Sequence, residues 1–105
     1  MDKISTIQNL CTNESIRLTK HAANMMEEHG ITFSDVKCGI KSGEIIEDYL
    51  TDYPNPSVLI LGNIDITPIH VCVGIGKNNI QIITAYKPSL DIWEDDLKTR
   101  KVVKP

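Results

Sequence analysis

Four strand-like segments in the second half of the chain constrain its fold more than any other feature. The segments "EIIEDYL", "SVLILG", "IHVCVGI" and "IQIITAY" are rich in the β-branched and aromatic residues that favour strands. The connections between them, "TDYPNPS", "GNIDITP" and "GKNN", contain residues typical of turns. Short connections join antiparallel neighbours, because a parallel pair needs a long crossover. Residues 44–86 therefore predict four consecutive antiparallel strands.

A short strand and a helix are expected before this sheet. Residues 16–19, "IRLT", alternate apolar and polar side chains, which predicts a strand with Ile16 and Leu18 facing inward. Thr19 is a suitable N-cap for a helix over residues 20–29, because its hydroxyl can accept from a free backbone N–H of the first turn. The strand should therefore lead directly into the helix.

Glycines and caps delimit a second helix and complete the predicted fold. Gly30 can close the first helix in the left-handed conformation, Ser34 with Asp35 begins the second, and Gly43 ends it. The order strand, helix, helix and four strands predicts an α+β domain. We expect two short helices to pack on one face of a twisted antiparallel sheet of four to five strands.

A single domain over residues 16–105 is expected, with residues 1–15 as an N-terminal lead-in. The tail, "SLDIWEDDLKTRKVVKP", is predicted to add a turn of helix. It also carries a local group of basic residues: Lys98, Arg100, Lys101 and Lys104.

Composition excludes several classes of protein. The net charge of -3 disfavours binding to nucleic acid by bulk electrostatics, although the basic tail leaves a local patch open. The longest aliphatic run, residues 58–61, is far too short to span a bilayer, and no signal peptide is recognisable, so we expect a cytoplasmic protein. Three widely spaced cysteines without a CxxC pair indicate reduced thiols, and we expect no metal or cofactor.

Two histidines flank the first predicted helix. Eight positions separate His21 from His29, which on a helix is about two turns and a rise of roughly 12 Å, so they cannot share one metal ion. His21 lies in the first turn, where the helix dipole disfavours the imidazolium form, and is a candidate general base. The alternative is a helix-start histidine that is exposed or hydrogen-bonded inside, and His29 is expected to be a C-terminal helix cation.

The third histidine, His70, shares a strand face with Cys72. Two ligands are too few for zinc, so a packed strand with a small buried thiol is the better interpretation. Across the hairpin His70 meets Ala85 if the loop is even, and Thr84 or Tyr86 if it is odd. The acidic residues of segment 44–52 could supply carboxylates for acid–base work, but are more often the solvated side of an edge strand.

One frame of residues resembles a known family. The blocks "TKHA", "GEIIEDY", "PNPS", "LILG", "IHV" and "IITAY" together resemble the domain-of-unknown-function family 4258, small prokaryotic proteins, over residues 16 to about 101. Some members are encoded beside a YgiT-type zinc-finger protein of the MqsA antitoxin kind, which implies a toxin–antitoxin module with such a protein as partner. The element order is also similar to that of RelE-type and BrnT-type ribonuclease toxins.

The resemblance implies RNA as a substrate and a cleavage reaction that needs no metal. A base would take the proton of the ribose 2'-hydroxyl, and an acid would protonate the leaving oxygen. The resemblance then implies His21 and His70 as base and acid, and Tyr86 as proton donor or base-stacking ring. Thr84 would donate a hydrogen bond to phosphate. Further phosphate contacts would come from Lys87, Arg100 and Lys101.

Two positions depart from the family pattern and support a second hypothesis. Many members place arginines where this chain has Met25 and His29, so a phosphate clamp is replaced by an apolar side chain and an imidazole. The second hypothesis is a non-enzymatic domain of the same fold that binds a partner or regulates it. Convergence of His21, His70 and Tyr86 in one cleft would favour the ribonuclease.

Overall fold

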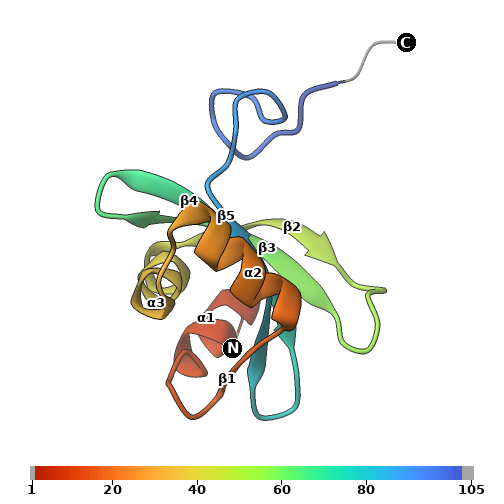
Figure 1. Ribbon diagram of the computed structural model, residues 1–105. Coiled ribbons are helices and arrows are strands. Elements are labelled where there is room, and N and C mark those ends of the chain that lie inside the picture. The colour runs from red at the N-terminus through yellow and green to blue at the C-terminus, as the bar shows by residue number, and fades with distance from the viewer. Residues whose placement is uncertain (1, 103–105) are drawn as a thin grey trace.

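The computed structural model describes residues 2–102 and shows an α+β domain with three helices and one five-stranded sheet (Figure 1). The elements in chain order are α1 (Lys3–Asn9), β1 (Ile16–Leu18), α2 (Lys20–His29), α3 (Phe33–Ser42), β2 (Glu44–Tyr49), β3 (Ser57–Ile64), β4 (Thr67–Ile75) and β5 (Ile80–Tyr86). The predicted order from β1 to β5 is confirmed. No helix in this part of the chain is long and apolar enough to cross a membrane.

The sheet has the strand order β1-β5-β4-β3-β2. β2, β3, β4 and β5 pair antiparallel with their neighbours as predicted, whereas β1 pairs with β5 in parallel, with Ile16 opposite Ile80. The expectation of a fully antiparallel sheet was therefore wrong at this edge. A parallel partner needs a long crossover, and the whole domain between β1 and β5 supplies it.

β1 also differs from its prediction in the side chains that it buries. Ile16 is buried, but Leu18 is 42% exposed. β1 is an edge strand of three residues, and the chain leaves the sheet into α2 directly after it, which leaves Leu18 partly exposed.

The two predicted helices begin and end at hydrogen-bonded caps. Thr19 accepts from the N–H of Ala22, and Gly30 closes α2 with a φ of 67°. α3 begins one residue earlier than expected, because Thr32 and Asp35 form a reciprocal capping box.

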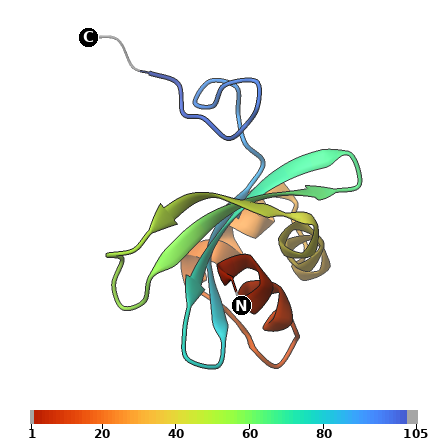
Figure 2. The ribbon, with the colours of Figure 1, turned by 180° about the vertical axis from the view of Figure 1, so that it is seen from behind.

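A third helix, α1, occupies the region expected to be a lead-in. Asp2 caps it, and Ile7 is fully buried in the main hydrophobic core of the domain. The Gln8 side-chain amide donates to the Ile40 carbonyl at 3.2 Å. In both ribbon views α1 and α3 lie on the same side of the sheet (Figures 1 and 2). A packed helix had not been predicted from the sequence of residues 1–15.

The other face of the sheet is covered by the segment after β5, which we call the C-terminal strap (residues 88–101). It lies on the side opposite α1 and α3 (Figures 1 and 2). Trp93 of the strap is 1% exposed and packs with Leu59 and Cys72. The expectation of a helical turn in the tail was wrong, because the strap is a series of turns held by a bridge between Trp93 and Arg100.

Close contact between α3 and β3 depends on two glycines. A Cβ atom on Gly62 would lie 1.9 Å from the carbonyl oxygen of Gly39, which is backbone and cannot rotate away. The absence of a side chain at both positions therefore lets α3 lie directly on the sheet.

We predict that Gly62→Ala lowers the free energy of unfolding by about 1–3 kcal/mol, because the methyl group forces α3 away from β3. Gly74→Ala is the matched control, since its Cβ would meet nothing nearer than a flexible Ile83 methyl at 3.4 Å. Urea unfolding of both variants checks this. Equal stability of the two variants would contradict the close approach.

Candidate functional site

A pocket of about 320 Å³ lies where α2, the end of β5 and the C-terminal strap meet. This volume is at the lower end of the range of roughly 300–1,000 Å³ for small-molecule pockets. Half of its lining comes from the body of the domain and half from the strap. The lining residues are Met25, His29, Tyr86, Lys87, Ser89, Ile92, Trp93 and Arg100.

α2 reaches the pocket because hydrogen bonds hold it alongside β5 at both ends. At its start the Thr19 backbone N–H donates to the Ile82 carbonyl, and the Thr19 hydroxyl donates to the Ile83 carbonyl, each at 3.1 Å. At its end the Lys87 N–H donates to Nδ1 of His29 at 3.3 Å. This alignment puts the C-terminal half of α2 beside the end of β5.

Tyr86 and His70 form a hydrogen-bonded pair beneath the pocket. His70 lies opposite Tyr86 across β4 and β5, and its Nδ1 is 3.1 Å from the Tyr86 hydroxyl oxygen. Its Nε2 is 2.8 Å from the carbonyl oxygen of Leu97 in the strap. A carbonyl can only accept, so Nε2 carries the hydrogen, and the Tyr86 hydroxyl must donate to Nδ1.

Burial keeps this pair in its neutral form. His70 is fully buried, with the ring of Trp93 edge-on at 4.5 Å between centroids. Desolvation lowers the pKa of His70, opposed in part by the hydrogen bond to Leu97. Burial also raises the pKa of Tyr86. At neutral pH the proton therefore stays on Tyr86, and His70 is an uncharged acceptor.

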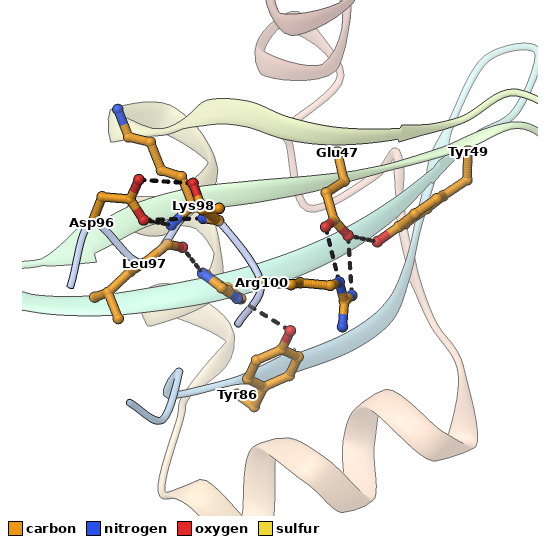
Figure 3. Close-up of polar contacts among 9 residues, drawn as sticks. Glu47, Tyr49, Tyr86, Asp96, Leu97, Lys98 and Arg100 are labelled. Atoms are coloured by element: carbon orange, nitrogen blue, oxygen red, sulfur yellow. Dashed lines mark hydrogen bonds and ion pairs between the residues drawn. The ribbon is translucent and has the colours of Figure 1, made fainter. Parts of the chain in front are cut away.

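A strained turn in the strap holds the carbonyl that His70 needs. Leu97 has a φ of 58°, which is unfavourable for a bulky side chain. The Asp96 carboxylate accepts from the N–H groups of Lys98 at 2.9 Å and Thr99 at 3.0 Å, as Figure 3 shows, and these bonds lower the pKa of Asp96. Asp96 therefore fixes the turn in which Leu97 adopts this conformation.

Arg100 closes the strap over the edge of the pocket. Its guanidinium donates to both Glu47 oxygens at 2.9 and 3.0 Å (Figure 3). It also lies 4.6 Å from the centre of the Trp93 ring. The Tyr49 hydroxyl also donates to Glu47. The Arg100 hydrogen bonds lower the pKa of Glu47, and burial with the Glu47 contact raises the pKa of Tyr49 to about 12.

The charges around the pocket are cationic. Lys87 and Arg100 line it, and no carboxylate belongs to the lining. Glu47 balances the charge of Arg100, but in residues 2–102 no carboxylate forms an ion pair with Lys87. The pocket therefore offers an anion one unpaired ammonium, although the chain as a whole has a net charge of -3.

The structure brings together four of the residues singled out from the sequence. His70 and Tyr86 are in contact, and Tyr86 shares the pocket lining with Lys87 and Arg100. The four-residue loop after Ile75 would pair His70 with Ala85, but a β-bulge after Cys72 shifts the register by one and selects Tyr86.

The other three lie outside the pocket lining. His21 is exposed in the first turn of α2, one turn before Met25. Thr84 is half-buried opposite Cys72, and Lys101 is exposed on the strap, where its N–H donates to the Ile92 carbonyl. Within the described chain no three metal-ligating side chains gather.

Five of the eight lining residues were not among the site residues predicted from the sequence. Met25 stood out only as a departure from arginine, and His29 as such a departure and as an expected C-terminal helix cation; these departures were the available signal. Ser89, Ile92 and Trp93 were assigned to a tail, in which the single tryptophan was the sign of a buried anchor.

The family described as Domain of unknown function (DUF4258) matches residues 18–87. Neither a curated protein nor a solved structure matches the chain. The matched segment contains Met25, His29, Tyr86 and Lys87, and it ends where the strap begins. The chain therefore belongs to the DUF4258 family, and the pocket lies between the family domain and the strap that follows it.

Proposed function

We propose that the protein is a ribonuclease-type toxin of a toxin–antitoxin module and that RNA enters the pocket at Tyr86. One observation carries the proposal: a tyrosine whose hydroxyl donates to a buried neutral imidazole lines the same pocket as two cationic side chains. Proton transfer and phosphate neutralisation are the two tasks that RNA cleavage requires. The resemblance to RelE-type toxins supports the same reaction.

In this proposal Tyr86 and His70 act as a relay that removes the ribose 2'-hydroxyl proton. Tyr86 takes that proton while it passes its own to Nδ1 of His70, so no free tyrosinate forms. The imidazolium that results is stabilised by the Leu97 carbonyl and by the Glu47 carboxylate. His70 is therefore a positioning and proton-accepting residue behind Tyr86, and does not touch RNA.

The cationic side chains bind the phosphate and neutralise its charge. The 2'-oxygen attacks phosphorus in line, giving a 2',3'-cyclic phosphate and a free 5'-hydroxyl. Lys87 and Arg100 neutralise the developing charge, and the Lys87 ammonium supplies a proton to the leaving oxygen. His21 lies one turn outside the pocket and contacts RNA beyond the reacting phosphate.

A non-enzymatic partner-binding or regulatory domain is the second candidate function. Arg100 is already paired with Glu47, both ring nitrogens of His70 are occupied, and His21 does not join them. The same pocket would then hold a segment of a partner, such as a YgiT-type antitoxin, without cleavage.

We predict that Tyr86→Phe reduces RNA cleavage by about 10²- to 10⁴-fold, because it removes the proton relay and keeps the ring. Its expression should no longer slow bacterial growth. Tyr53→Phe is the control, since Tyr53 is 95% exposed and lies outside the pocket lining. Intact RNA after incubation with the wild-type protein would overturn the ribonuclease and leave the second candidate.

The pH dependence of cleavage tests the role of His70. The relay needs neutral His70, and burial lowers the pKa of His70. The acid limb of the activity profile should therefore begin below the ordinary histidine value of 6.5. The side chain of His70→Asn keeps an acceptor at the Nδ1 position for the Tyr86 hydroxyl but does not titrate in this range. We expect this variant to fold, to cleave slowly and to lose the acid limb in kcat/KM. An unchanged profile would exclude His70 from the reaction.

A further inference from the structure

The two halves of the pocket differ in origin. Met25, His29, Tyr86 and Lys87 belong to the segment that matches the family, whereas the strap side chains follow it in the sequence. The strap is anchored through buried Trp93 and through the bond between Leu97 and His70. It therefore forms a fixed wall opposite α2.

The walls of the pocket suit a flat ring with apolar faces. Met25 and the ring of Tyr86, from the body of the domain, and Ile92, from the strap, supply apolar and aromatic surface, whereas Trp93 also lines the pocket but is only 1% exposed. Stacking on such side chains is how proteins commonly hold unpaired bases, whatever their sequence. Lys87 and Arg100 are in the same lining, so a ring that carries a phosphate matches the pocket better than an uncharged ligand.

Two hydrogen-bond donors can hold the edge of such a ring. His29 presents Nε2–H, since its Nδ1 is engaged by the Lys87 N–H. The Ser89 oxygen accepts from the Asp91 N–H at 3.1 Å, which leaves the Ser89 hydroxyl hydrogen available to donate. A base in this pocket would therefore be bound by its faces and by acceptors on its edge.

We infer that the pocket receives one unpaired nucleobase, so that single-stranded RNA is the substrate and the strap is the element that selects it. The inference rests on the proposed function and names the substrate class of that site. A paired base in an A-form helix cannot enter, because it would first have to leave its stack and its partner. Duplex RNA would therefore contact only the outer edge of the pocket.

Binding of 2'-O-methyl RNA, which cannot be cleaved, tests the inference on the wild-type protein. By fluorescence anisotropy, we expect a single-stranded oligonucleotide to bind at least about fivefold more tightly than its duplex or than the same strand with abasic sites, because stacking of one base is lost. Equal affinity for the three ligands would overturn the inference.

A matched pair of strap variants locates the effect. Ile92 and Leu90 are each 55% exposed on the strap, but only Ile92 lines the pocket. Ile92→Asn should weaken single-strand binding by about fivefold or more, whereas Leu90→Asn should bind as the wild type does. Equal loss in both variants, or in neither, would overturn the inference.

Cleavage of unmodified RNA separates this inference from the proposed function. Selective binding of single strands without cleavage keeps the base pocket and overturns the ribonuclease. Equal cleavage of single-stranded and duplex RNA keeps the ribonuclease and overturns the base pocket.

Discussion

The buried imidazole of His70 is the constraint on which the strap and the pocket depend. A polar side chain in the middle of a sheet must have its hydrogen bonds satisfied, because an unpaired buried polar group is costly. One ring nitrogen finds Tyr86 on the neighbouring strand, and the other finds the Leu97 carbonyl. The second bond holds the strap across the sheet, and the strap in turn forms the pocket wall opposite α2.

Charge and strain are both concentrated where the strap meets the sheet. Leu97 adopts an unfavourable backbone conformation, and the turn around Asp96 holds it there. Arg100 lies between Trp93 and Glu47, so its charge is offset while its planar group covers an aromatic ring. The strained conformation of Leu97 lowers local stability but holds its carbonyl in place for His70, as is common where a site must keep one geometry.

Much of the fold could be predicted from the sequence, and much of the site could not. The caps at Thr19 and Gly30 and the β-branched runs were local signals, so α2 and the strands were recognised. The bulge that aligns His70 with Tyr86 depends on packing between strands and leaves no local mark. The strap was missed because its turns resemble a polar tail, and only Trp93 indicated burial.

The parallel pairing of β1 with β5 has a consequence for the order in which the domain can form. Thr19 and Ile83 are hydrogen-bonded although they lie 64 positions apart. During synthesis the chain emerges from its N-terminal end, so β1 and the start of α2 remain without their sheet partner until β5 has left the ribosome. Residues 88–101 are made later still. A nascent chain therefore lacks both the pairing of β1 with β5 and the complete pocket. An activity that needs this pocket would begin only after the strap had been translated.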